Sequence, residues 1–191
     1  MKTVKIGNQN WTDHNLVLTS YNNGDSIPLA KNNTEWVNFN KKKEGCYCFF
    51  DNDDTNASKG LFYNGYAVID SRGIAPNGFS IPTSSDFDEL IEFVNSQEGG
   101  LLNLLNKVGW DEHFVGTEIY ELNALPCGLV TVDMKFLSPN NRLALWTSSK
   151  VEKYLTGYAL STYVDDEEEE VSFSSYNYDI RYGFNLRLIK K

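Results

Sequence analysis

The amino-acid sequence predicts one α+β domain, with two helices packed on a mostly antiparallel sheet. A chain of 191 residues is long enough to enclose one sizeable core. Residues 81–100 have the apolar spacing of an amphipathic helix, whereas the sequence after residue 142 alternates apolar and polar residues. Strands and helices do not alternate along the chain, which argues against a doubly wound parallel sheet.

The first half of the chain has one strong helix signal. Residues 4–12 predict an opening strand, and the Asn-, Gly- and Ser-rich sequence up to residue 44 predicts an irregular excursion. The Thr/Ser run at 83–85 offers N-caps for a helix that Gly99 and Gly100 can stop. The apolar face of that helix consists of Phe87, Leu90, Ile91 and Val94. A second, shorter helix is expected within residues 101–110.

The second half predicts four antiparallel strands, at residues 142–149, 154–164, 170–178 and 182–191. In the last of them Phe184, Leu186 and Leu188 are expected on one face. Trp146 is expected in the core, because Leu143 and Leu145 share its strand.

Charge and hydropathy exclude some classes of partner. The formal charge of −9 and the pI near 4.7 disfavour phosphate backbones, so we expect no nucleic-acid partner. No apolar run approaches the roughly 20 residues of a membrane span, and the N-terminal sequence lacks a signal-peptide pattern, so we expect no membrane insertion. Three cysteines are an odd number, which does not indicate a disulfide framework.

The segment "CYCFFDNDDT", residues 46–55, resembles the first motif of haloacid-dehalogenase-type phosphatases. That resemblance implies Asp51 as the nucleophile and Asp53 as the general acid, with Mg²⁺ held partly by Asp165 and Asp166. Lys150 would balance the charge. The predicted antiparallel sheet argues against this phosphatase hypothesis, because the motif in that family ends the first strand of a parallel sheet.

The same acids permit two other interpretations. Asp51, Asp53 and Asp54 are closely spaced oxygen donors that could hold one structural calcium ion, although Ala57 and Phe62 exclude an EF-hand loop. Alternatively, the acids form a turn stabilised by Asx side chains, which we favour. Zinc is weakly indicated, because Cys46, Cys48, Cys127 and the two histidines, His14 and His113, have no clustered spacing.

Tyrosines are concentrated near the C-terminal end. Tyr, Ser and Asn are the residues with which binding surfaces make rigid contacts and adaptable hydrogen bonds. The predicted ligand-binding residues are Tyr154, Tyr158, Tyr163, Tyr176, Asn177, Tyr178 and Tyr182. Each of these aromatic side chains could equally fill a sheet. The acidic run at 165–170 is expected to be a solvated hairpin loop, or else a docking patch for a basic partner or cation.

Several segments, taken in order, resemble the Fibrobacter succinogenes major paralogous domain. They are "VKIGNQNWTDHNL" at 4–16, "CYCFFDNDDTNASKGLFY" at 46–63, "APNGFSIPTSSDFDELIEFV" at 75–94, "WTSS" at 146–149 and "YGFNLRLIK" at 182–190. The resemblance covers most of the chain. It implies a fold of the C-type-lectin-like, formylglycine-generating-enzyme-like kind, with the first and last strands adjacent.

The departures from the family pattern concern cysteines. The family usually has cysteine where this chain has Ser58, Ala75 and Leu188, and the last two look like the paired loss of one bridge. Such losses suggest a protein that folds in a reducing cytoplasm. Neither the sugar-binding calcium motif of C-type lectins nor the active-site cysteine pair of formylglycine-generating enzymes is present.

The sequence therefore predicts a non-enzymatic binding or assembly module. The expected setting is a bacteriophage virion, as a fibre, decoration or receptor-binding component assembled after folding in the host cytoplasm. A bacterial cell surface is the alternative location. The expected partner is a protein or glycan surface, other virion proteins, or further copies in a homo-oligomer.

Overall fold

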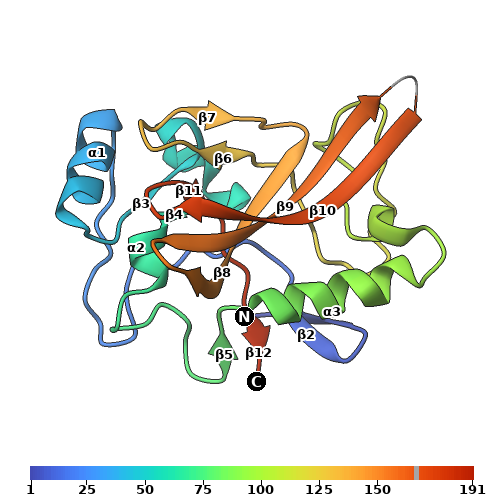
Figure 1. Ribbon diagram of the computed structural model, residues 1–191, viewed down its shortest axis with the longest axis horizontal. Helices are drawn as coiled ribbons and strands as arrows, with labels where there is room; N and C mark the ends of the chain where they lie inside the picture. Colours follow the sequence, from blue (N-terminus) through green and yellow to red (C-terminus); the bar gives the residue numbers. More distant parts are fainter. Residues whose placement is uncertain (166–167) are drawn as a thin grey trace.

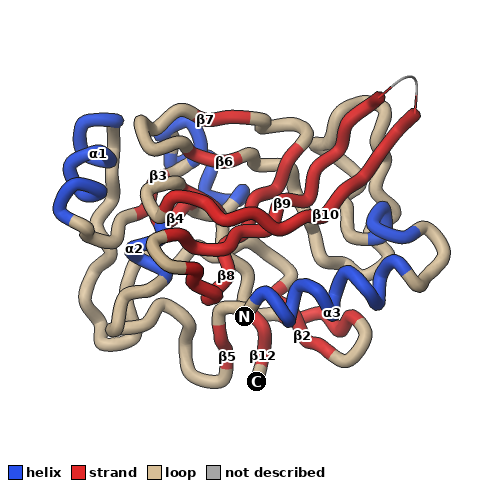
Figure 2. Tube along the Cα trace, in the orientation of Figure 1, coloured by secondary structure: helices blue, strands red, loops and turns tan. Residues whose placement is uncertain are grey.

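The computed structural model describes residues 1–165 and 168–191, with side chains described outside 165–168, and has an α+β architecture (Figure 1). Its described strands form three antiparallel sheets, and its two main helices lie beside them (Figure 2). The predicted α+β class and antiparallel pairing are confirmed. No helix within the described residues is long and apolar enough to cross a membrane.

The first sheet joins the two ends of the chain. Its strands, in spatial order, are β1 (Thr3–Ile6), β2 (Gln9–Thr12), β12 (Ile189–Lys190) and β5 (Phe79–Ser80). Ile189 pairs with Trp11, so the N- and C-terminal strands are adjacent, as expected, and the termini lie close together (Figure 1). The predicted single strand over 4–12 is in fact a hairpin, because Gly7 takes a left-handed conformation, φ 57°, between β1 and β2.

The second sheet is the predicted meander. Its order is β10 (Glu168–Asp179), β9 (Tyr154–Asp165) and β8 (Arg142–Val151). The pairing of β8 with β9 shifts register between Trp146 and Lys150, which is a local irregularity of the ladder. Three of the four C-terminal strands are thus confirmed, each with slightly longer bounds.

The predicted fourth strand, 182–191, is divided. Its first part, β11 (Gly183–Phe184), belongs to the third sheet, whose order is β3 (Tyr47–Cys48), β4 (Phe62–Asn64), β11, β6 (Leu129–Val130) and β7 (Phe136–Leu137). Asn185 then exchanges backbone hydrogen bonds with β8, and β12 joins the first sheet. The segment changes partners along its length, so it forms no single strand. Phe184, Leu186 and Leu188 are all fully buried.

The predicted amphipathic helix is α3 (Ser84–Asn95). Thr83 and Asp86 form a reciprocal capping box at its start, and Phe87, Leu90 and Val94 are buried. Ile91 is partly buried against the same cluster. The helix ends before Gly99, and the expected second helix is only the 3₁₀ turn η3 (Gly100–Asn103).

A further helix, α1 (Asn33–Lys42), lies where an irregular excursion was expected, so that prediction was wrong. The Asn32 side chain caps it by accepting from the Glu35 amide, and Lys43 ends it with φ 58°. Its Asn- and Lys-rich sequence has little apolar periodicity. Trp36 anchors it, since its side chain is completely buried.

Much of the remaining chain is loop stabilised by hydrogen bonds. The short elements are α2 (Gly65–Val68) and the 3₁₀ turns η1 (Phe50–Asn52) and η2 (Asp54–Lys59). Residues 104–128 contain neither helix nor strand (Figure 2). Trp110 packs that loop onto the core and donates from Nε1 to the Ala124 carbonyl at 2.9 Å.

Candidate functional site

The β9–β10 hairpin carries six of the seven predicted ligand-binding residues, but it divides them between two faces. Directly paired residues of an antiparallel ladder point to the same side of the sheet. Tyr158 is paired with Ser175, and Asn177 with Thr156, on one face. Tyr176 is paired with Gly157 and belongs to the opposite face. The seven residues therefore do not form one surface.

Tyr158 is a core residue. Its side chain is 2% exposed and its ring stacks on that of Phe87, with centroids 4.6 Å apart. Its hydroxyl donates to the Asp88 carboxylate and to the Ser84 carbonyl. Burial and the neighbouring Asp88 raise the pKa of Tyr158 to about 12. Tyr158 thus connects β9 to α3. Because its ring is buried, it does not offer the ligand-binding surface that the sequence predicted.

Three other tyrosines form a continuous aromatic surface, which we call the tyrosine ridge: Tyr176, Tyr178 and Tyr182. The Tyr176 and Tyr178 centroids are 5.9 Å apart, and those of Tyr178 and Tyr182 are 5.8 Å apart. Tyr176 is 55% exposed, whereas the other two are partly buried. Burial raises the pKa of Tyr178, so its hydroxyl remains a donor at neutral pH.

The ridge rests on a rigid base. The Tyr178 ring stands nearly perpendicular to the rings of Phe184 and Trp146, whose centroids lie 4.6 Å and 6.3 Å from its own. Trp146 stacks on Phe184, with ring centroids 4.1 Å apart. Trp146 is buried and donates from Nε1 to the Tyr63 carbonyl at 2.8 Å, so its predicted core location is confirmed. Gly157 leaves room for these rings, because a Cβ there would lie 2.5 Å from Phe184.

The remaining predicted tyrosines lie outside the ridge. Tyr163 is 43% exposed, and its hydroxyl donates to the Glu170 carboxylate. Tyr154 is partly buried near the ammonium of Lys153, and Asn177 accepts a hydrogen bond from Thr156 at 3.2 Å. Residues 166–167 of the acidic run lie outside the described residues.

The acids of the 51–54 segment form a structured turn. Asp51 has a left-handed backbone, φ 52°, which Asp and Asn tolerate better than most residues. Asp53 accepts from the Thr55 amide at 2.9 Å and from its hydroxyl at 2.7 Å, and these hydrogen bonds lower the pKa of Asp53. Asp54 is exposed. This is the Asx-type turn that the sequence favoured.

The calcium and phosphatase hypotheses gain no site from this geometry. Among the described side chains, no group of three or more His, Cys, Asp or Glu residues could hold a metal ion. Asp51 and Asp53 therefore belong to no such group with Asp54. Asp166, the second acid proposed for Mg²⁺, lies outside the described residues, and the named strands pair antiparallel.

An open pocket of about 360 Å³ lies beside the acidic turn. Phe49, Lys31, Asp53 and Asp54 contribute to its lining. It combines one aromatic ring with charges of both signs, which suits a polar ligand better than an apolar one.

The cysteines are free thiols, as expected, and lie in a common apolar cluster. Cys46, Cys48 and Cys127 pack with Phe50 and Phe62, whereas Phe49 packs against a different cluster. Burial raises the pKa of all three thiols, that of Cys127 to about 11. They are therefore poor nucleophiles and poor metal ligands.

The structure also locates Ser58, Ala75 and Leu188, the positions where the family usually has cysteine. Leu188 is fully buried, and the partly buried Ala75 packs against the same cluster. Two positions in one cluster are consistent with the paired loss of a bridge. Ser58 is exposed, whereas Cys46 and Cys48 are buried.

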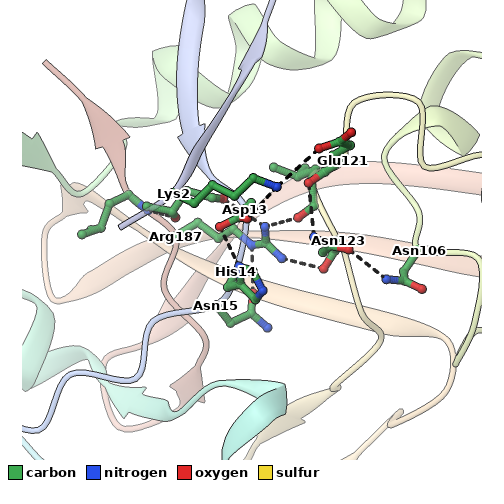
Figure 3. A network of polar contacts seen from close by, with 11 residues as sticks. Lys2, Asp13, His14, Asn15, Asn106, Glu121, Asn123 and Arg187 are labelled. Atoms are coloured by element: carbon green, nitrogen blue, oxygen red, sulfur yellow. Dashed lines mark hydrogen bonds and ion pairs between the residues drawn. The ribbon is translucent and has the colours of Figure 1, made fainter.

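The least expected feature is the fully buried Arg187 (Figure 3). Its guanidinium donates to the Asn15 side-chain oxygen at 2.9 Å and to the carbonyls of Thr12 at 3.1 Å, Leu122, and Asn123 at 2.8 Å. Burial lowers its pKa to about 10. One side chain thus connects the end of β2, the 104–128 loop and the C-terminal segment.

Acidic and basic groups near Arg187 continue this network to the surface. Asp13, with its side chain 4% exposed, lies 3.5 Å from the Lys2 ammonium and 2.6 Å from the His14 imidazole. Asp13 also raises the pKa of Arg187, so it supplies countercharge to the buried cation. Lys2 reaches Glu121 at 3.4 Å. The period-two pattern of "GFNLRLIK" points Arg187 away from the face of Leu186 and Leu188, so the sequence carried no signal of its burial.

Comparison with known proteins identifies the family. No curated protein and no solved structure gives a significant match. Residues 4–190 match the family model described as the Fibrobacter succinogenes major domain. Because that match covers nearly the whole chain, the chain belongs to the Fibrobacter succinogenes major domain family.

Proposed function

We propose that this chain is a non-enzymatic binding or assembly module with a C-type-lectin-like fold, and that the tyrosine ridge is its contact surface. Adjacent terminal strands, antiparallel sheets and two helices support the fold assignment. The ligand is a protein or glycan surface. A surface of neighbouring tyrosines buries contact area at little cost in side-chain entropy, and its hydroxyl groups supply hydrogen bonds.

The observation that carries this proposal is the exposure of Tyr176 above a set of packed aromatic rings. Tyr176 is 55% exposed, although it contacts Tyr178, whose ring is held by Trp146 and Phe184. An exposed large aromatic residue supported in this way is typical of an interface anchor. Tyr182 extends the same surface across the turn that follows β10.

The setting that we propose is a phage virion, with the chain acting as a fibre, decoration or receptor-binding component. Three buried free thiols fit a chain that folds in a reducing compartment such as the host cytoplasm. A bacterial cell surface is the alternative location, and the ridge would serve adhesion there.

The test combines a printed glycan array with sedimentation velocity over a range of protein concentrations. Wild-type protein should bind a subset of glycans or self-associate, and Tyr176→Ala should weaken either interaction by about tenfold or more, as loss of an aromatic anchor does. Tyr163→Ala is the matched control, because Tyr163 is exposed on the same hairpin but outside the ridge. A wild-type protein that binds no glycan and stays monomeric excludes glycans and self-association as the contact, and unchanged binding by Tyr176→Ala contradicts the proposal.

A further inference from the structure

A recess of about 300 Å³ lies beside the polar network of Figure 3 and outside the tyrosine ridge. Its lining is mostly apolar and includes Leu16, Val17 and Leu18, together with Lys2, Asp13 and His14. Leu16 is buried, whereas Val17 is 54% exposed. A volume at the lower end of the roughly 300–1,000 Å³ range of ligand pockets suits one ring rather than a larger molecule.

The polar wall of this recess is built by an Asp–His pair. The Asp13 side chain is only 4% exposed, and His14 Nδ1 lies 2.6 Å from Asp13 Oδ1. An ionised carboxylate only accepts hydrogen bonds, so the proton between them is assigned to Nδ1. Nε2, the other ring nitrogen, is then left to form a hydrogen bond with a ligand. His14 is 69% exposed, so no other part of the fold covers this ring.

Asp13 is held in place by its burial and by Lys2, since its side chain is 4% exposed and its Oδ2 lies 3.5 Å from the Lys2 ammonium. The buried carboxylate in turn contacts the His14 imidazole beside the recess. A hydrogen-bonding ring nitrogen next to an apolar wall favours a ligand that has a ring and one hydroxyl group.

We propose that this recess binds a phenolic ring, whose apolar face packs on Leu16, Val17 and Leu18 while its hydroxyl forms a hydrogen bond with His14 Nε2. This site is independent of the tyrosine ridge, so its failure in an experiment leaves the proposed function standing. The phenol belongs either to a free small molecule or to a tyrosine side chain of a peptide.

Titrations of isotope-labelled protein with p-cresol and with toluene, followed by NMR chemical shifts, test this site. Both ligands should shift the signals of Leu16, Val17 and Leu18 saturably. One hydrogen bond should make p-cresol bind about threefold to tenfold more tightly than toluene. Equal affinities, or shifts that lie elsewhere in the protein, overturn the proposal.

Variants separate the two parts of the site. His14→Leu should bind both ligands equally, whereas His113→Leu, at the other exposed histidine, should keep the preference for p-cresol. Val17→Arg should weaken both ligands without any change at His14, and it serves as the test should His14→Leu fail to fold. A preference for p-cresol that persists in His14→Leu overturns the proposal.

N-acetyl-tyrosinamide distinguishes the two sources of the ring. If it binds at least as well as p-cresol, the ring is a peptide tyrosine. If its amide groups prevent binding while p-cresol still binds, the recess is a site for a free phenol.

Discussion

The ring of Tyr158 stacks on that of Phe87, with an interplanar angle of 14°, and its hydroxyl donates to the Asp88 carboxylate. This contact fastens the long β9–β10 hairpin to α3. It also removes from the surface a tyrosine that the sequence placed on a ligand-binding face. Both faces of the hairpin contribute core residues, Tyr158 on one and Leu155 on the other, and the face of Leu155 also carries the exposed Tyr176.

Substitution of Tyr158 should lower stability without any effect on ligand binding. Tyr158→Phe keeps the stacked ring but removes the hydrogen bond to Asp88, whose side chain is exposed to water, so it should cost about 0.5–1.5 kcal/mol. Tyr158→Ala also leaves a cavity and should cost about 3–5 kcal/mol. Urea denaturation measures both values. Tyr163→Phe, at an exposed position, should stay within about 0.5 kcal/mol of wild type, and equal losses in the two Tyr→Phe variants would contradict this role.

Alkaline conditions should unfold the protein in a defined range. The folded-state pKa values of Tyr158 and Tyr21 are raised to about 12 from the ordinary value of 10.0, mainly by burial. A raised pKa means that the folded state holds the proton more tightly, so stability is complete below pH 10 and is lost as pH rises toward 12. Denaturation midpoints measured from pH 8 to 12 check this. Tyr158→Phe should show a shallower decline, and an identical pH profile would count against it.

Arg187 should be indispensable for the connection between the two ends of the chain. Arg187→Met removes the donors of four hydrogen bonds and leaves their buried acceptors unsatisfied, so we expect a loss of about 3–5 kcal/mol. Arg187→Lys should recover only a small part of it, because an ammonium cannot reproduce the planar fork. Arg181→Lys, at an exposed arginine, is the control for the chemical change itself. An Arg187→Lys variant as stable as the wild type would exclude a specific contribution of the guanidinium to stability.

The three cysteines should not react with thiol reagents in the native protein. Cys46, Cys48 and Cys127 are buried, and burial raises the pKa of each thiol, so both access and thiolate formation are suppressed. A thiol-specific colorimetric reagent should find almost no reactive thiol at pH 8 and all three in guanidinium chloride. Rapid labelling of a cysteine in the native state would be incompatible with this packing.

The sequence predicted those elements whose signal is local. Helix α3 has its cap, its apolar face and its stop within 18 residues, from Thr83 to Gly100, and the strands β8, β9 and β10 have a period of two. Helix α1 was missed because the contacts that hold it in place, through the buried Trp36 and Asn40, are tertiary. Residues 182–191 alternate like one strand, yet their backbone pairs with strands of all three sheets in turn, which no local pattern reveals.

The candidate site was predicted only in part for the same reason. Composition drew attention to the tyrosines, but the direction of each side chain depends on register, which places Tyr158 inside and Tyr176 outside. Arg187 was missed because its partners, the Thr12 and Asn123 carbonyls among them, are backbone groups far away in sequence.

The most direct test of the central claim, that the tyrosine ridge is the contact surface, is the ratio of dissociation constants between Tyr176→Ala and wild type. It should be measured for the glycan bound most tightly on the array, or for self-association if no glycan binds. The ridge predicts a ratio of about ten or more for Tyr176→Ala and a ratio near one for Tyr163→Ala, with the fold of both variants intact. Ratios near one for both variants would show that the protein makes its contacts through another surface.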